Sequence, residues 1–120
     1  MAQINKIAGT AYLKVDGNQY SLRGSVTANL KSFNREGVAG LDQVHGYKET
    51  PMVPFIEVEL STTPEMDLNV LAGLDDVTVQ LECANGKAGL LRNAWANTGD
   101  VNPEEGTVTV KFEGKSGEWL

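Results

Sequence analysis

The sequence predicts one mainly β domain: two antiparallel sheets packed as a sandwich or partial barrel, with one short flanking α-helix. Two observations support this fold class. Apolar and polar residues alternate in six segments, and apolar residues recur at helical spacing in a single segment. Alternation with a period of two is typical of strands that bury one face and leave the other in water. At 120 residues the chain is long enough for a real core.

The six alternating segments are residues 10–16, 19–23, 25–31, 55–61, 76–83 and 107–113. Their apolar residues, which we expect to face the core, are Ala11, Leu13, Val15, Tyr20, Leu22, Val26, Ala28, Leu30, Ile56, Val58, Leu60, Val77, Val79, Leu81, Cys83, Val108, Val110 and Phe112. The dipeptides Asp16-Gly17 and Asn85-Gly86 predict tight hairpins, because residues of these types tolerate a positive φ.

The helix is predicted near residues 65–73. Thr63 or a neighbour can cap its N-terminus, and Pro64 and Glu65 suit its first turn. Gly73 is a natural stop. The apolar stripe of this helix is Met66, Val70, Leu71 and Leu74. A short helix between strands, without repeated strand–helix alternation, favours an antiparallel architecture.

Two stretches have no clear period. Residues 32–53 read as a long connection, and residues 115–120 read as a short C-terminal tail. Both hold more apolar residues than a solvated linker needs, so we expect both to bury surface against another molecule. The candidate contact residues of the long loop are Phe33, Leu41, Val44, His45, Tyr47 and Met52. We expect this loop to be mobile in an isolated chain; an ordered loop within the chain is the alternative.

The charge balance argues against a surface that grips nucleic acid. The chain has 16 acidic and 10 basic residues and a net charge of −6, and its basic residues are scattered singly. Solubility alone is another reason for such acidity. One cysteine excludes an internal disulfide and is compatible with a reducing compartment. The sequence has no apolar run near the ~20 residues of a membrane span and no signal-peptide core at its start.

No enzyme, metal or cofactor motif in the sequence has the residues and spacing that its chemistry requires. Cys83 continues the apolar face of a predicted strand, which indicates an inert core thiol. His45 is the single histidine, and one histidine with one cysteine cannot supply a zinc site within the chain. The triplet GKS at 114–116 ends a phosphate-loop pattern, but Thr109 stands where that pattern needs glycine. We therefore predict no catalytic activity and no cofactor.

Four stretches carry a family resemblance that spans nearly the whole chain in order. They are AGTAYLKVDG at 8–17, GLDQVHGYKETPMVPFIEVEL at 40–60, VTVQLECANGKAGLLRNAW at 77–95 and GTVTVKFEG at 106–114. In these stretches the chain resembles the tail tube proteins of contractile-tailed, Mu-like bacteriophages. The resemblance implies two antiparallel sheets packed at a steep angle, with one helix at the side. It further implies six subunits per ring, with their inner sheets joined into a barrel around a channel.

The resemblance also implies partners and a location. Stacked rings would form the inner tube of a contractile tail, the conduit for DNA ejection. The chain would bind itself, the tail sheath protein, and the tape measure, tail terminator and baseplate proteins. Phage DNA would pass through the lumen without specific binding, and no membrane is implied. The protein would lie in the virion tail, and in the host cytoplasm during assembly. The long loop would contact a neighbouring subunit or ring, with His45 as a structural polar group.

The strands predicted at 24–31 and 54–61 flank the long loop, so we expect them to pair as an extended hairpin of the inner barrel. Their polar faces would then line the lumen with Ser25, Thr27, Asn29, Glu57 and Glu59. Hydroxyls and carboxylates offer phosphate groups no cation to pair with. The alternative is that Glu57 and Glu59 face outward and serve solubility alone.

Two other functions remain open from the sequence. The first is a tube subunit of a related machine, such as a phage-tail-like bacteriocin or a type VI secretion device. The second is a monomeric β-sandwich module that binds a ligand in a surface groove.

Overall fold

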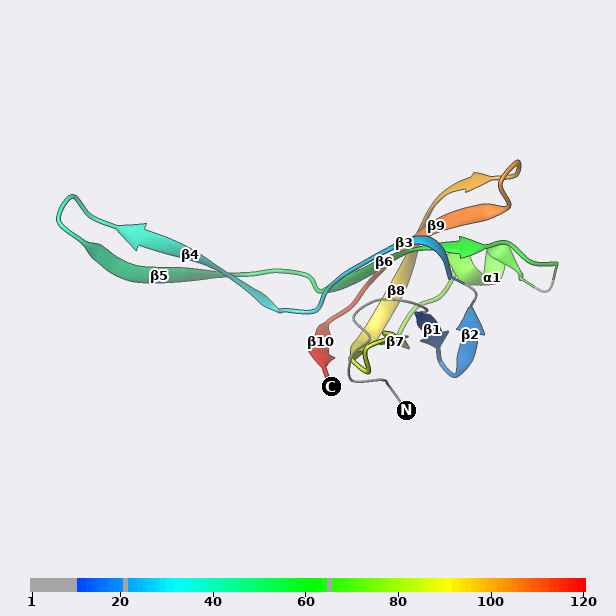
Figure 1. The fold of residues 1–120 in the computed structure, drawn as a ribbon, viewed down its shortest axis with the longest axis horizontal. Helices are drawn as coiled ribbons and strands as arrows, with labels where there is room; N and C mark the ends of the chain where they lie inside the picture. Colours follow the sequence, from blue (N-terminus) through cyan, green and yellow to red (C-terminus); the bar gives the residue numbers. More distant parts are fainter. Residues whose placement is uncertain (1–10, 21, 65) are drawn as a thin grey trace.

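The computed structural model describes residues 11–20, 22–64 and 66–120, and it confirms a mainly β fold of antiparallel sheets with one short helix (Figure 1). The elements of this part of the chain are β1 (Tyr12–Val15), β2 (Asn18–Tyr20), β3 (Leu22–Asn29), β4 (Phe33–Ala39), β5 (Val44–Pro51), β6 (Phe55–Ser61), α1 (Leu68–Ala72), β7 (Val77–Glu82), β8 (Ala88–Asn102), β9 (Thr107–Glu113) and β10 (Ser116–Trp119).

Two antiparallel sheets share the long strand β8. The first sheet has the order β2-β1-β7-β8-β10, and the second has the order β8-β9-β6-β3. Residues 88–94 of β8 pair with β7, whereas residues 95–102 pair with β9. A bulge lies at the change of partner, where Asn93 has a φ of 52° and its Nδ2 donates to Asp76 Oδ1 at 2.7 Å. Such a bulge bends a strand, which lets β8 pass from one sheet into the other.

The core lies between the two sheets and contains the residues that the alternation predicted, except Ala11, which is half-buried outside it. Fully buried members include Leu13, Val15, Ile56, Val58, Leu60, Val79, Leu81, Val108, Val110 and Phe112, and Tyr20, Leu22, Val26, Ala28 and Cys83 pack against them while partly buried. The predicted pairing of the strands around the long loop is also confirmed, because β3 and β6 are antiparallel neighbours with Val26 opposite Val58.

Both predicted hairpins are present, with different turns. Asp16 and Gly17 have φ values of 50° and 86° and connect β1 to β2. At the second turn Gly86 has a positive φ of 90°, whereas Asn85 has not. Here the Gly86 N–H donates to Cys83 O at 3.1 Å and the Cys83 N–H donates to Lys87 O at 2.8 Å. This pattern is the three-residue hairpin loop that ends with a glycine in the left-handed region.

The helix begins later than predicted. Asp67 is its N-cap, and Asp67 Oδ1 accepts hydrogen bonds from the N–H groups of Asn69 and Val70 at 2.9 and 3.3 Å. Thr63 belongs instead to a preceding turn, in which its carbonyl accepts the Met66 N–H at 3.0 Å. The predicted end at Gly73 is confirmed. The expectation for Glu65 falls outside the described residues.

Residues 32–53 are not the irregular connection that the sequence predicted. They form the hairpin β4–β5, in register from Phe33 opposite Pro51 to Ala39 opposite Val44, with a bulge next to Ala39. Every residue of both strands is exposed. An amphipathic period arises only where one face is buried, so this hairpin leaves no alternation to recognise in the sequence.

The predicted C-terminal tail also forms regular structure. Strand β10 pairs with the first half of β8, with Trp119 opposite Gly89. Leu30, which follows the end of β3, is 3% exposed. A Cβ atom at Gly89 would lie 2.8 Å from Leu30 Cδ1. Glycine at this position therefore makes room for Leu30 at the base of the β4–β5 hairpin.

Gly114→Ala is expected to destabilise the fold. Its Cβ atom would lie 2.8 Å from both Arg92 O and Leu91 Cγ, so backbone and core must move apart. We expect a loss of about 1–3 kcal/mol in the free energy of unfolding, measured by urea denaturation of the unassembled chain. Gly37→Ala is the matched control, because no atom lies within 4 Å of its added Cβ. Equal stability of the two variants would contradict the prediction.

Candidate assembly surfaces

The hairpin of residues 33–51, called the arm below, projects from the body of the protein into solvent (Figure 1). The molecule measures 61 × 36 × 27 Å, and its radius of gyration is 17.1 Å. A compact domain of this length has a radius of gyration of about 14 Å. The arm accounts for this elongation, and no arm residue belongs to the hydrophobic core.

Polar pairs across its two strands hold the arm in register. Arg35 Nε donates to Glu49 Oε1 at 2.9 Å, and the Arg35 guanidinium lies 4.9 Å from the centre of the Tyr47 ring. Lys48 Nζ lies 3.4 Å from Glu36 Oε2 on the opposite face. Exposed cross-strand pairs of this kind contribute a few tenths of a kcal/mol each, enough to bias register but small beside a core.

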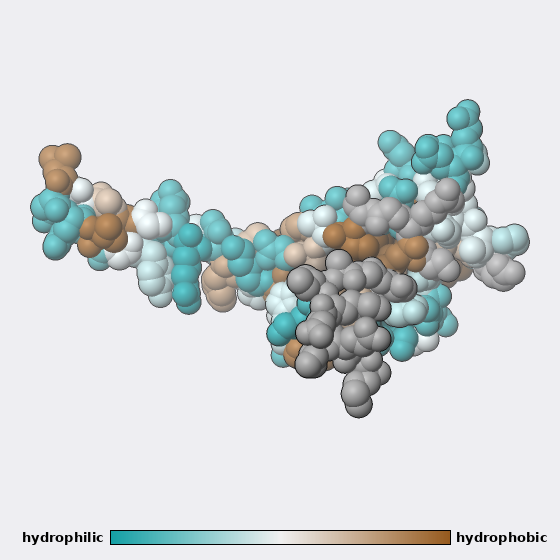
Figure 2. All heavy atoms as spheres, in the orientation of Figure 1, coloured by the Kyte–Doolittle hydropathy of each residue, from teal (hydrophilic) through white to brown (hydrophobic). Residues whose placement is uncertain are grey.

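One face of the arm carries exposed apolar side chains on either side of the Arg35–Glu49 pair, and the Arg35 guanidinium lies over the Tyr47 ring. Cross-strand partners share a face, so the pairs Phe33–Pro51, Gly37–Tyr47 and Ala39–Val44 lie together. Phe33, Tyr47 and Val44 are all more than half exposed, and hydrophobic residues gather at the far end of the arm (Figure 2). Of the other predicted contact residues, Met52 lies at the arm's base and is partly buried. An exposed apolar face on a projecting hairpin is typical of a protein–protein contact.

The tip of the arm, residues 40–43, is a turn closed by a backbone hydrogen bond. The Gly40 N–H donates to Gln43 O at 2.8 Å, and His45 Nε2 lies 3.1 Å from Asp42 Oδ1. The hydrogen bond from His45 lowers the pKa of the Asp42 carboxyl below its ordinary value of 3.8, with smaller contributions from backbone N–H groups. Leu41 is fully exposed at 111%. His45 thus contacts the tip carboxylate, and Leu41 points into solvent.

The residues predicted to line a channel lie on the outward face of the second sheet. Thr27 stands opposite Glu57, both exposed, while Asn29 and Glu59 are half-buried in the same two strands. Ser25's side chain falls outside the described part of the chain. Whether this face borders a lumen stays a prediction.

The same face also carries a cation, which comes from a third strand. Lys111 of β9 stands directly opposite Glu57, and its Nζ lies 4.6 Å from the centre of the Phe55 ring. The alternation in segment 107–113 already placed Lys111 on the side away from Phe112, so the sequence held this signal. This face still carries more acidic than basic residues among those named, because Glu59 and Glu113 lie on it together with Glu57.

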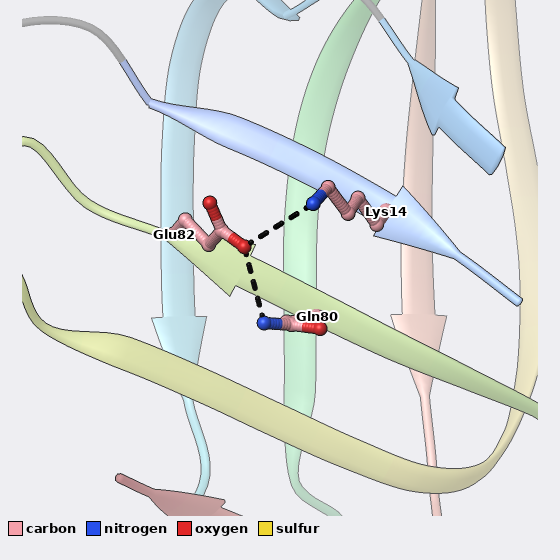
Figure 3. A network of polar contacts seen from close by, with 3 residues as sticks. All are labelled: Lys14, Gln80 and Glu82. Atoms are coloured by element: carbon pink, nitrogen blue, oxygen red, sulfur yellow. Dashed lines mark hydrogen bonds and ion pairs between the residues drawn. The ribbon is translucent and has the colours of Figure 1, made fainter. Parts of the chain in front are cut away.

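The outward face of the first sheet is also polar. Glu82 Oε1 lies 3.5 Å from Lys14 Nζ and accepts a hydrogen bond from Gln80 Nε2 at 3.2 Å (Figure 3). The strands of the second sheet run across this sheet behind it, so the two sheets cross steeply. The Lys14 and Glu82 side chains are 40% and 38% exposed, and a partly exposed pair of this kind contributes little to stability.

The second sheet ends on strands without a neighbour on their outer side. In the described part of the chain, β3 pairs with β6 alone, and residues 95–102 of β8 pair with β9 alone among the strands. Exposed strand edges present unpaired N–H and C=O groups and favour pairing with another chain. The described residues contain no group of His, Cys, Asp and Glu that could hold a metal ion, and no helix among them is long and apolar enough to cross a membrane.

Comparison with solved structures defines the class of this fold. The sheath/tube terminator of an extracellular contractile injection system, PVC, superimposes with a TM-score of 0.66 at 8% identity, covering 100% of this chain and 99% of that one. Hcp1 from Flavobacterium johnsoniae superimposes with a TM-score of 0.61 at 16% identity, covering 91% and 93%. The chain therefore shares one fold with a tube-terminating protein and with Hcp1.

The sequence places the chain more narrowly. The model of the family "Phage tail tube protein" matches residues 4–119. The tail tube protein of Escherichia phage Mu is 24% identical over 91 residues, 76% of each chain. The chain belongs to the phage tail tube protein family, as the sequence resemblance predicted.

Proposed function

We propose that this protein is the subunit of the inner tube of a contractile phage tail. Six copies form a ring, and rings stack into a tube that conducts DNA during ejection. The observation that carries the proposal is the arm: a projecting hairpin with exposed apolar side chains on one face, in a chain that belongs to the tail tube family. Such a surface gains free energy only when a partner covers it.

The second sheet would form the wall of the channel in this assembly. The unpaired outer sides of β3 and of residues 95–102 of β8 would join the second sheets of neighbouring copies, which removes the exposed edges. A head-to-tail contact of this kind closes into a ring when its rotation allows. The row containing Thr27, Glu57 and Lys111 would then face the lumen. Its acidic balance would keep DNA phosphates from adhering to the wall.

The other proposed partners follow from the family. The outer surface of the stacked rings would contact the tail sheath protein, and the ends of the tube would contact the tail terminator and baseplate proteins. The tape measure protein would occupy the lumen before DNA does. The protein would be located in the virion tail, after assembly in the host cytoplasm.

A second candidate function has a specific observation in its favour. The similarity to a PVC terminator and to Hcp1 supports a tube subunit of a phage-tail-like or type VI machine that delivers no genome. The match to the Mu tail tube protein, which covers 76% of both chains, favours the phage reading. A monomeric binding module is less well supported, because it would leave the arm uncovered.

Assembly of the purified protein tests the proposal. We expect size-exclusion chromatography at high concentration to show hexamers or larger species, and negative-stain electron microscopy to show rings and hollow tubes. Burial of one arm per copy supplies the hydrophobic driving force. A protein that stays monomeric at every concentration and salt condition would refute tube formation. Encapsidated DNA in particles carrying these tubes would separate the phage from the injection machines.

A further inference from the structure

We propose that the tip of the arm docks in one cavity on the next copy of this chain, with Leu41 as its apolar anchor. The cavity, called the socket below, lies between the β7–β8 turn and strand β10. This inference rests on the proposed function and names the partner surface of the arm. The contact is head to tail, so each copy supplies one tip and one socket.

The socket combines an aromatic wall with a free cation. It has a volume of about 590 Å³, and its described lining residues are Cys83, Asn85, Lys87 and Trp119. Trp119 is half exposed, although it sits within a paired strand. Lys87 is exposed, and no ion pair of Lys87 occurs in the described part of the chain. A half-exposed tryptophan in a hollow is a common anchor point of protein interfaces.

The tip is complementary to the socket in both polarity and charge. Leu41 makes an apolar projection, and the neighbouring Asp42 carboxylate is 72% exposed. Leu41 against Trp119 buries apolar surface, and Asp42 beside Lys87 pairs opposite charges as that surface leaves water. The bond between His45 and Asp42 holds the carboxylate in place before docking. Preorganisation of this kind reduces the entropic cost of binding.

The other two described cavities fit the tip less well. The cavity beside α1 has both polar and apolar walls, and it includes the Asp67 carboxylate, which would repel Asp42. The cavity at the base of the arm is lined by Lys31, Ser32, Phe33, Arg35 and Glu49. It also offers an aromatic ring and a lysine, but it contains the Glu49 carboxylate, which would repel Asp42 and already pairs with Arg35. The arm also projects away from its own body, so the tip cannot reach the socket of its own chain (Figure 1).

The direction of the arm and the shape of the socket depend on the same packed residues. A Cβ atom at Gly89 would lie 2.8 Å from Leu30 Cδ1 and 3.1 Å from Trp119 Cζ3. Leu30 lies at the base of the arm, and Trp119 forms a wall of the socket. Both side chains therefore pack against the backbone of Gly89. This shared contact connects the base of the arm to the wall of the socket within one copy.

The single cysteine of the chain makes the contact testable, because Cys83 lines the socket. In tubes of the Leu41→Cys variant, treatment with oxidised glutathione should join Cys83 of each copy to the new thiol of the next. Thiol–disulfide exchange forms this bond and releases two molecules of reduced glutathione. Non-reducing electrophoresis should show a ladder of dimers, trimers and longer species, since each chain takes part in two bonds.

Two controls isolate the contact. Leu41→Ser with Cys83 intact should give monomers, and Leu41→Cys with Cys83→Ser should give no species beyond a dimer. A third variant carries Leu41→Cys, Cys83→Ser and Ser32→Cys, and it reports docking at the base of the arm, which Ser32 lines. The proposal would be overturned if oxidised tubes of the Leu41→Cys variant ran only as monomers on the non-reducing gel. A ladder from the third variant would also overturn it. A disulfide requires Cα atoms within about 7 Å, so proximity elsewhere does not suffice.

The unaltered protein supplies a second measurement if Leu41→Cys fails to assemble. Cys83 is partly exposed in the single chain. Docking of the tip should slow its alkylation by a maleimide by at least about tenfold in tubes relative to unassembled protein, because thiol reactivity follows access. Equal alkylation rates in intact tubes would reject the socket while leaving tube formation established. Absence of tubes from the unaltered protein would instead reject the proposed function, and the docking with it.

Discussion

Excision of the arm is expected to leave a folded body that forms no tubes. In this variant an Asn-Gly dipeptide replaces residues 33–51 and joins Ser32 to Met52. These two residues are already adjacent, since the Met52 N–H donates to Ser32 O at 2.9 Å. Asn-Gly suits the two-residue turn that such adjacent strand ends need. Because the core contains no arm residue, the free energy of unfolding should change by less than about 1 kcal/mol, measured in urea.

Tube formation should respond far more strongly than stability. Loss of a central apolar anchor typically costs an interface 2 kcal/mol or more, roughly a thirtyfold loss of affinity per contact. Single variants separate the two faces of the arm: Phe33→Ser should impair polymerisation, whereas Asn34→Ser on the opposite face should not. Electron microscopy and sedimentation measure both. Tubes of normal length from the armless protein would show that the arm is dispensable for stacking.

The sequence predicted those parts of the fold in which one face of a strand is buried. Ile56, Val58 and Leu60 alternate because the core lies on one side of β6, and burial of that side imposes the pattern. The strand β8 escaped prediction for the opposite reason. Its bulge at Asn93 separates the buried residues Leu91 and Ala94 by three positions, which disrupts the period as the strand changes sheets.

The hairpin of the arm could not be predicted from local sequence pattern, for a different reason. Its residues face water on both sides in a single chain, so local pattern carried no strand signal, although the excess of apolar residues predicted a contact surface. The pairing of Arg35 with Glu49 depends on the antiparallel pairing of β4 with β5, which no local sequence rule specifies. The proposed docking of the arm's tip depends on the same hairpin. The candidate lumen residues could be predicted more directly. Opposite faces of a strand follow from the alternation of its residues, and the same alternation places Lys111 on the polar side of β9.

Reversal of charge at Glu57 and Glu59 is expected to slow DNA delivery without preventing tube assembly. The double variant Glu57→Lys and Glu59→Lys places two cations per chain beside Lys111 on the outward face of the second sheet. If that face borders the lumen, DNA phosphates would pair with the wall as they pass. We expect the rate of DNA delivery to fall by roughly tenfold or more, because clefts lined by charge of one sign change encounter rates on that scale. Infectivity and the time course of DNA release from complemented particles measure the effect.

The control must separate position from net charge. Asp75→Lys with Glu104→Lys makes the same change of charge at exposed residues outside the strands, away from the proposed lumen and ring contacts, and should leave delivery unchanged. Lysine opposite Lys111 costs about 0.2–1 kcal/mol through repulsion of like charges, so tube morphology is checked first. If both double variants slow delivery equally, net charge is the cause. If normal tubes of the Glu57 and Glu59 variant deliver DNA at the normal rate, the second sheet does not line the channel. The unpaired edges of β3 and β8 would then need another role, because the closed barrel that they would form is the reason for assigning that face to the lumen.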